Sequence, residues 1–210
     1  DNGQLLVGDI FHHVSLYNKA VTLTTQAANL VKDWRFPYES FAFPFGLSDD
    51  ASGNIYVTDT GNCRVVKMAG ATNNTYIGQW GYPVDNPLAV NNVTGPQFNA
   101  PLGIDVDAAG NVFVIDRDVN PDDILFRVRG RMQQFPPTAG TFCLNQSGST
   151  VNRYRSSFQH FYYPTGIATD GTDLFIADTG GGPITMGATR KSGVQRIGID
   201  GSSKVIYTGS

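Results

Sequence analysis

Cysteine, histidine and charged residues are all scarce in this chain of 210 residues. It contains two cysteines and three histidines, and charged residues make up 16% of the chain, with a formal net charge of −3. The low charge argues against a nucleic-acid-binding protein and against an acidic solvating tail. No apolar run approaches the length of a membrane span and no signal peptide is recognisable, which argues against membrane insertion. The sequence also lacks a glycine-rich phosphate loop, a nucleophile elbow and a paired-cysteine motif.

Glycine and proline are abundant instead, with 24 and 11 copies, and apolar residues at 40% suffice for a folded core. Many turns between short segments are typical of short-stranded β folds. Helical periodicity is absent except for a weak candidate at residues 25–31. An all-β protein is therefore predicted.

A Pro-x-Gly turn occurs three times, and each copy leads through an alternating segment into a strand that ends in aspartate. The interval from proline to aspartate is 15, 15 and 14 residues. A β-sandwich has no reason to repeat a motif at nearly fixed internal spacing, so the intervals favour a repeat fold. The three pairs are Pro44 and Asp59, Pro101 and Asp116, and Pro164 and Asp178.

The repeat divides the chain into units at about residues 1–42, 43–98, 99–161 and 162–210. Each unit reads as a four-stranded antiparallel meander with period-two patterning, and such meanders repeated around a centre make a β-propeller. The first unit lacks its innermost strand, because residues 3–9 align with residues 53–59. The later strands are expected at 13–17, 20–26, 64–68, 75–80, near 124–128, at 194–199 and at 204–208.

The second unit resembles the repeat of NHL proteins, through Pro44-Phe45-Gly46-Leu47 and the run from Gly53 to Val65. The third unit keeps residues 101–116 of this pattern, the fourth keeps 164–180, and the first keeps only its second strand. The resemblance covers nearly the whole chain. It implies an NHL-type β-propeller, or a segment of one, with four-stranded blades and four visible units.

The motif residues have structural roles in this interpretation. The turn glycines Gly46, Gly103 and Gly166 let the chain turn tightly into the innermost strand. The closing aspartates are expected to accept backbone N–H groups of the turn that follows. Gly61 and Asn62 are expected to supply the positive φ of a tight hairpin.

The resemblance extends superficially to an amidating-enzyme lyase, whose metal site resembles a ring of histidines in the slots after the turn proline. Those slots hold Phe45, Leu102 and Thr165 in this chain, so the ring is missing. Adjacent strand residues point to opposite faces, so His12 and His13 would not easily share one ion. We interpret all three histidines, His12, His13 and His160, as surface or turn residues.

Paired carboxylates are the other metal candidates, since oxygen ligands suit Ca²⁺. No spacing matches a dedicated calcium loop, so no cofactor and no catalytic residue are predicted. Arginines within 127–131 and 153–155 form a local basic patch, which the net charge of −3 identifies as solvated insertion residues rather than an RNA site. The carboxylate pairs are Asp49 with Asp50, Asp105 with Asp107, and Asp122 with Asp123.

Three Asn-X-Ser/Thr sequons, at Asn73, Asn92 and Asn145, fall in expected turns or insertions and indicate N-glycosylation. The even cysteine count allows one disulfide between Cys63 and Cys143, or two buried thiols. Together these features predict an extracellular or cell-surface location.

The incomplete first unit leaves three explanations for the architecture: a part of a longer polypeptide, an unusual four-bladed ring, or sheets completed by neighbouring subunits. The first is favoured. The predicted function is a non-enzymatic scaffold or protein-interaction module, within a self-assembling surface polymer, with protein partners or copies of itself. The alternative is a divalent-metal-dependent lyase or hydrolase acting at the central channel. Binding surfaces are expected at the incomplete ends and at the insertions 81–98, 129–163 and 180–192.

Overall fold

A computed structural model gives the fold of the chain. It describes residues 5–9, 13–17, 30–34, 41–70, 76–81, 98–118, 129–135, 152–154, 163–178, 193–199 and 203–208. Within this part of the chain, no helix has the length and apolar character needed to cross a bilayer.

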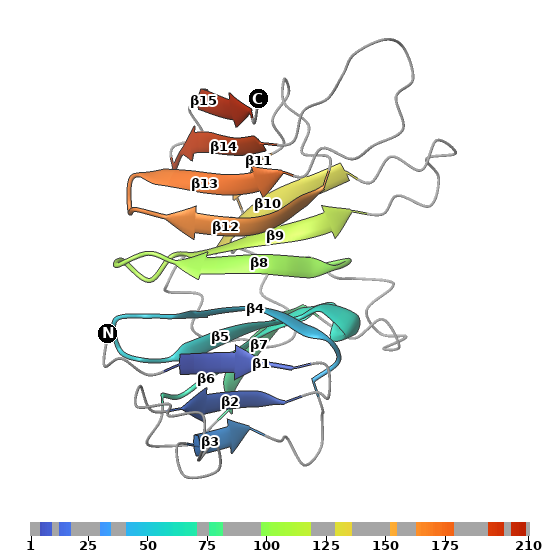
Figure 1. The fold of residues 1–210 in the computed structure, drawn as a ribbon, viewed down its shortest axis with the longest axis vertical. Helices are drawn as coiled ribbons and strands as arrows, with labels where there is room; N and C mark the ends of the chain where they lie inside the picture. The colour runs from blue at the N-terminus through green and yellow to red at the C-terminus, as the bar shows by residue number, and fades with distance from the viewer. Residues whose placement is uncertain are drawn as a thin grey trace.

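The described residues form four antiparallel sheets, which we number I to IV (Figure 1). A 3₁₀ turn, η1 (Thr60–Asn62), links β5 to β6. Each sheet draws its strands from one of the four predicted units, in chain order. Sheet I contains β1 (Leu5–Gly8), β2 (Val14–Tyr17) and β3 (Leu30–Trp34); sheet II contains β4 (Pro44–Asp49), β5 (Ile55–Asp59), β6 (Arg64–Met68) and β7 (Tyr76–Gly81). Sheet III contains β8 (Pro101–Val106), β9 (Val112–Asp118), β10 (Arg129–Phe135) and β11 (Asn152–Tyr154); sheet IV contains β12 (Pro164–Thr169), β13 (Asp173–Asp178), β14 (Gly193–Gly198) and β15 (Ser203–Thr208).

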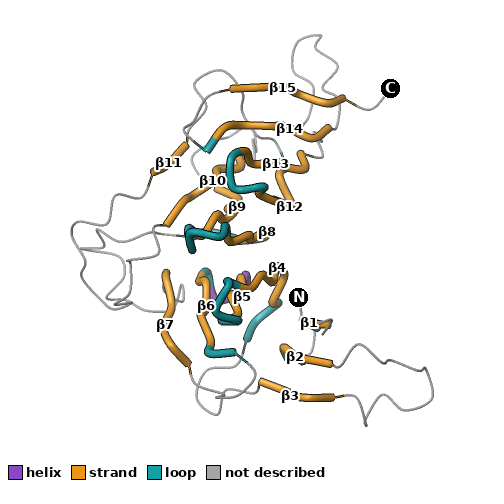
Figure 2. Tube along the Cα trace, turned by 90° about the vertical axis from the view of Figure 1, so that its left-hand side faces the viewer, coloured by secondary structure: helices purple, strands orange, loops and turns teal. Residues whose placement is uncertain are grey.

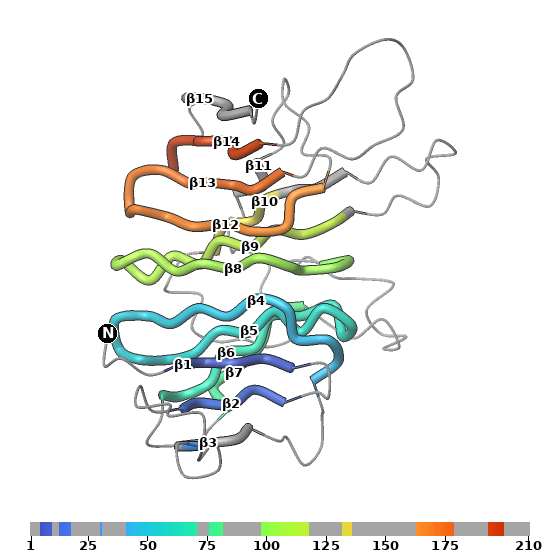
Figure 3. Tube along the Cα trace, in the orientation of Figure 1, coloured from blue at the N-terminus to red at the C-terminus, as the bar shows by residue number. Residues whose placement is uncertain are grey.

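The sheets follow one another in chain order, from sheet I at the blue end to sheet IV at the red end (Figure 3). Seen from the side they form a fan: β4, β8 and β12 lie close together, while the outer strands β7, β11 and β15 spread apart (Figure 2). Strands β4 and β12 both contact β8, and β1 contacts β4. This radial arrangement of small antiparallel sheets is propeller-like.

The core consists of three apolar layers, one between each pair of neighbouring sheets. Strand β5 is buried along its length, and β9 is buried from Val112 to Asp116, because both faces of each are covered by a neighbouring sheet. Sheets I and II enclose Val14, Leu16, Phe41, Ile55, Val57, Val66 and Met68. Sheets II and III enclose Tyr56, Val65, Trp80, Phe98, Ile104, Val112, Val114 and Phe135, and sheets III and IV enclose Phe113, Ile115, Met132, Leu174, Ile176 and Ile197.

Two expected strands differ from the structure. The third strand of sheet III is β10, which lies beyond the predicted residues 124–128 because the connection from β9 is longer than expected. In sheet I the last strand is β3, whereas the expected strand at 20–26 lies outside the described residues. The start of β3 overlaps the weak helical candidate at 25–31. The sequence did not predict this strand, because five residues carry too little periodicity to be recognised.

Gly46 and Gly103 are required for close approach of neighbouring sheets, and none of the three turn glycines has a positive φ. A Cβ atom on Gly46 would collide with the backbone oxygen of Leu102, and one on Gly103 would lie 2.7 Å from the oxygen of Thr165. The positive φ expected at Gly61 and Asn62 is wrong: it occurs at Cys63, with φ 52°. Gly61 is needed because a Cβ there would lie 2.8 Å from Cβ and O of Ala42.

Candidate functional site at the Pro-x-Gly end of the sheets

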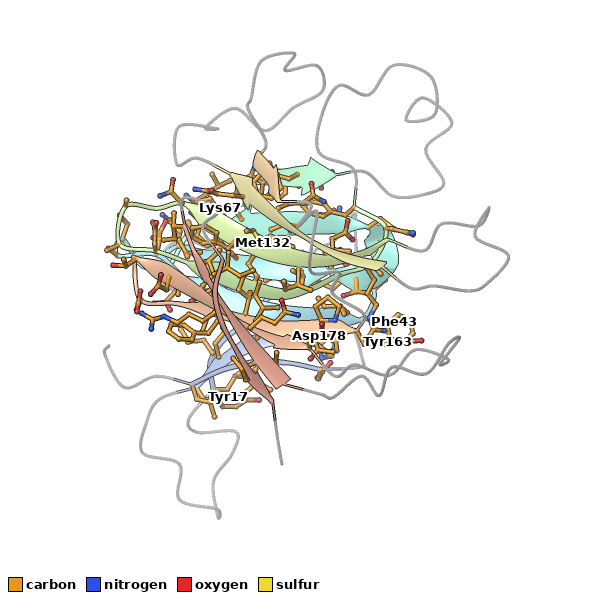
Figure 4. The ribbon with its side chains drawn as sticks, turned by 90° about the horizontal axis from the view of Figure 1, so that it is seen from above. Tyr17, Phe43, Lys67, Met132, Tyr163 and Asp178 are labelled. Atoms are coloured by element: carbon orange, nitrogen blue, oxygen red, sulfur yellow. The ribbon has the colours of Figure 1, made fainter. Side chains whose placement is uncertain are left out.

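One end of the fan gathers the repeated motif residues. Strands β4, β8 and β12 begin there, and the paired strands end there, with Pro44 opposite Asp59, Pro101 opposite Asp116 and Pro164 opposite Asp178. We call this the Pro-x-Gly end. In Figure 4 the labelled residues Phe43, Tyr163 and Asp178 lie on this side, whereas Tyr17 and Lys67 lie on the opposite side.

The three closing aspartates are buried structural clamps. Each accepts a backbone N–H from the segment before the turn proline, at 2.6 Å from Ala42 to Asp59 and 3.0 Å from Tyr163 to Asp178. Asp116 accepts the N–H groups of both Asn99 and Ala100. The structural role expected for these carboxylates is thus confirmed, but their backbone donors precede the Pro-x-Gly turn instead of following the aspartate.

The second carboxylate oxygen of each clamp accepts a side-chain hydrogen bond from the third strand of its sheet. Asp59 accepts from Arg64 Nε at 2.6 Å, with both side chains almost fully buried. In sheets III and IV a glutamine takes this role, Gln133 for Asp116 and Gln195 for Asp178, each at 3.0 Å. All three clamps are therefore occupied by fold-stabilising contacts and are poorly suited to bind a ligand.

Sheet I departs from this pattern. Its aspartate, Asp9, accepts the backbone N–H of His13 at 3.1 Å, and His13 Nδ1 lies 3.6 Å from the second Asp9 oxygen. The side chains of His13 and Asp9 are 31% and 40% exposed, in contrast to the buried Asp59–Arg64 pair. Gly8 pairs with Val14, so the next residues outward, Asp9 and His13, lie opposite each other. In sheet II the residue opposite the aspartate is Arg64, which pairs with Asp59.

An accessible histidine can act as a general acid or base, and a carboxylate beside it can hold the ring in one orientation. The interpretation of His13 as a surface or turn residue agrees with its place between β1 and β2, but it did not include the contact with Asp9. The alignment of Asp9 with Asp59 was the signal that could have revealed it, since His13 then replaces the arginine of the motif. The other two histidines, His12 and His160, lie outside the described residues.

The slots after the turn prolines hold no metal ligands. Phe45 is 59% exposed and follows Phe43, which is 63% exposed, by two residues, whereas Leu102 is buried and Thr165 is half-buried. Two exposed phenylalanines therefore lie at the Pro-x-Gly end. Within the described part of the chain, no group of three or more His, Cys, Asp or Glu side chains could hold a metal ion.

Three of the carboxylates considered for Ca²⁺, Asp50, Asp105 and Asp107, have other contacts in the structure. Asp50 accepts hydrogen bonds from Ser52, Asn54 and Tyr56 in the hairpin turn at the opposite end from the prolines. Burial raises the pKa of Asp50, but these hydrogen bonds and Lys67 outweigh it and lower the pKa overall. Asp107 accepts from Asn111 in the corresponding turn of sheet III. Asp49 is exposed, and Asp122 and Asp123 lie outside the described residues.

Asp105 links three sheets. Its carboxylate accepts from Ser48 Oγ of sheet II at 3.0 Å and from the backbone N–H of Thr169 of sheet IV at 2.7 Å. Thr58 makes a similar link, donating from Oγ1 to the backbone oxygen of Leu102 at 2.6 Å. These bonds hold the inner strands in fixed positions, and the sequence offered no signal for them because each joins residues of different repeats.

Cys63 is buried, and its Sγ lies 3.0 Å from the backbone oxygen of Asn99. Burial raises its pKa, with the nearby Asp116 and Asp59 adding to the effect, so Cys63 is a poor nucleophile. Its predicted partner Cys143 and the sequons at Asn73, Asn92 and Asn145 lie outside the described residues. The disulfide and the glycosylation therefore stay predictions.

Solved structures with a similar fold include propeller enzymes. A streptogramin B lyase superposes with a TM-score of 0.56 and 14% identity, covering 97% of this chain and 51% of its own length. Virginiamycin B lyase from Staphylococcus aureus superposes with a TM-score of 0.56 and 9% identity, covering 100% of this chain and 53% of its own length. A gluconolactonase from Xanthomonas campestris superposes with a TM-score of 0.57 and 14% identity, covering 99% of this chain and 58% of its own length. The chain thus spans about half the length of each. No protein-family model and no curated protein sequence matches it.

Proposed function

We propose that this chain is part of a β-propeller enzyme, a lyase or hydrolase that acts at the Pro-x-Gly end of the central channel. The observation that carries the proposal is the accessible His13–Asp9 pair, in a position where the neighbouring sheet has a buried Asp59–Arg64 pair. The similar folds of two lyases and a gluconolactonase support an enzyme over a scaffold. The NHL-type repeat and its four-stranded blades are part of this proposal.

His13 would accept the proton in this reaction. In a lyase it would take the proton from the carbon next to the bond that breaks, the C–H electron pair would form a double bond, and the departing group would receive the proton. In a hydrolase it would take the proton from the attacking water and return it to the group that leaves. Asp9 would orient the imidazole and stabilise the imidazolium that forms. A virginiamycin B lyase described as catalytically inactive carries alanine in place of one histidine, which makes a histidine-dependent reaction a reasonable expectation for this fold.

Replacing His13 with alanine tests the proposal. With quinupristin and gluconolactone as probe substrates, the unaltered protein should turn over at least one, and the rate of His13→Ala should fall by about 100-fold or more. The matched control is Ser52→Ala, in an exposed turn at the opposite end, which should keep the rate of the parent. A folded parent protein without turnover of either probe, or a fully active His13→Ala variant, would refute the proposal.

A second candidate is a protein-interaction module on an extracellular glycoprotein. The exposed Phe43 and Phe45 favour it, because exposed aromatic side chains at one end of a fold are typical of binding surfaces. On this reading, the protein purified from its native source should carry N-linked glycans at Asn73, Asn92 and Asn145, which peptide mass spectrometry would detect as sequon-specific mass additions. Unmodified asparagine at all three positions would remove the extracellular assignment.

A further inference from the structure

Neighbouring sheets pack by one rule. Each sheet has a leading face, which covers the next sheet along the chain, and a trailing face, which receives the sheet before it. The leading face of sheet II includes Tyr56 and Val65, and that of sheet III includes Phe113 and Met132. The trailing faces of sheets II, III and IV include the pairs Ile55 and Val57, Val112 and Val114, and Leu174 and Ile176.

The leading face of sheet IV is open. Val194 of sheet IV occupies the position that Val65 has in sheet II and Met132 has in sheet III. Each pairs with the residue just before the closing aspartate, which is Ala177, Thr58 and Ile115, respectively. Val65 and Met132 are fully buried, yet Val194 is 39% exposed. Phe175 occupies the position of Tyr56 and Phe113 and is only half-buried, while both of those residues are buried. None of the other described sheets covers this face (Figure 1).

The trailing face of sheet I is open at the other end of the fan. Leu5 and Val7 align with Ile55 and Val57 of sheet II, which are 5% and 0% exposed. Leu5 is 53% exposed and Val7 is 36% exposed. The described part of the chain therefore has one unpartnered leading face and one unpartnered trailing face, the two types that pack together at every internal layer.

We propose that the leading face of sheet IV binds the trailing face of sheet I of a second copy of this chain, head to tail. The second copy supplies a trailing face for sheet IV and a leading face for sheet I. The contact would therefore have the same arrangement as the three internal layers, in which a leading face packs on a trailing face. Two copies would bring eight sheets together, within the usual range for propellers. They would also match the similar enzymes in size, since one copy spans 51% to 58% of their length. This inference is independent of the proposed reaction.

A head-to-tail contact joins two different patches, so copies associate into a closed ring or into an open polymer. Light scattering of the purified chain should give a mass of at least two copies. Val194→Asp, which places a charge on the leading face, and Leu5→Asp, which places one on the trailing face, should each weaken association at least about tenfold. Ile77→Asp is the matched control, since Ile77 is 43% exposed but lies on the outermost strand of sheet II, and it should associate like the parent.

Mixing the two interface variants distinguishes this contact from a symmetric one. Leu5→Asp keeps an intact leading face and Val194→Asp keeps an intact trailing face, so an equimolar mixture should form a dimer that neither variant forms alone. Far-UV circular dichroism confirms that each variant is folded. A parent protein that stays monomeric at the highest soluble concentration would overturn the proposal. Two variants that associate like the parent, or a mixture without dimer, would also overturn it.

Discussion

Replacing Asp59 with alanine is expected to lower the free energy of unfolding by about 3 to 5 kcal/mol, the usual cost of breaking a buried ion pair by removing one partner. The Asp59 and Arg64 side chains are 0% and 3% exposed, and the Arg64 Nε is 2.6 Å from the carboxylate. Removal of Asp59 takes the charged acceptor away from Arg64 Nε, while Arg64 Nη1 still donates to the side-chain oxygen of Gln79. It also takes the acceptor away from the N–H of Ala42 and from the amide of Asn62.

Urea denaturation measures this loss, and a second variant separates its causes. Asp59→Ala combined with Arg64→Met removes both charges, so the double variant should be more stable than Asp59→Ala alone, even though it carries more changes. If the free energy of unfolding of Asp59→Ala is within about 1 kcal/mol of the parent value, the Asp59–Arg64 pair does not stabilise the fold as proposed. If the double variant is the less stable of the two, the loss comes from the backbone contacts rather than from the orphaned charge.

Much of the inner half of each sheet follows from the sequence. The repeat places proline opposite aspartate in three sheets, and the structure pairs Pro44 with Asp59, Pro101 with Asp116 and Pro164 with Asp178. Strand β6 covers the predicted residues 64–68. These features are local: period-two patterning and turn chemistry act over a few residues, so a single sequence is enough to recognise them.

The features that sequence reasoning missed depend on contacts between repeats. Strand β10 pairs with β9 across a long connection, and no local signal sets the length of that connection. The partners of Asp105 come from two other sheets, Ser48 and Thr169. The turn glycines were recognised at the right position but for the wrong reason, since Gly46 and Gly103 are crowded by the backbone of the next repeat.

The candidate site shows the same limit. Aligning the repeats identified Asp59, Asp116 and Asp178 as structural residues, and the buried clamps confirm this. The departures from the repeat proved more informative, because sheet I keeps the aspartate and replaces arginine by His13, which leaves the pair accessible. A motif-based reading gives most weight to the unit closest to the family pattern, whereas the accessible His13–Asp9 pair belongs to the unit that departs from it most.

Replacing Gly103 with alanine is expected to destabilise the protein by about 3 kcal/mol, at the upper end of the usual range for overpacking. The added Cβ would lie 2.7 Å from the backbone oxygen of Thr165, 2.9 Å from Gly166 Cα and 3.0 Å from the Ile167 nitrogen. All three atoms belong to the backbone of β12, so no side chain can rotate away to make room. The strand itself would have to move, and this would strain the bond from Thr169 N–H to Asp105.

Gly166→Ala is the matched control, because Gly166 occupies the same position of the repeat in sheet IV. The nearest atom to its added Cβ is Ala177 Cβ at 3.8 Å, an ordinary contact. The free energy of unfolding of this variant should therefore be within about 0.5 kcal/mol of the parent value. Both variants are compared by urea denaturation in dilute solution. Equal losses at the two positions would show that the conformational freedom of glycine in the turn matters most. A loss confined to Gly103 would show that the approach of the next sheet is what excludes a side chain from the Pro-x-Gly turn.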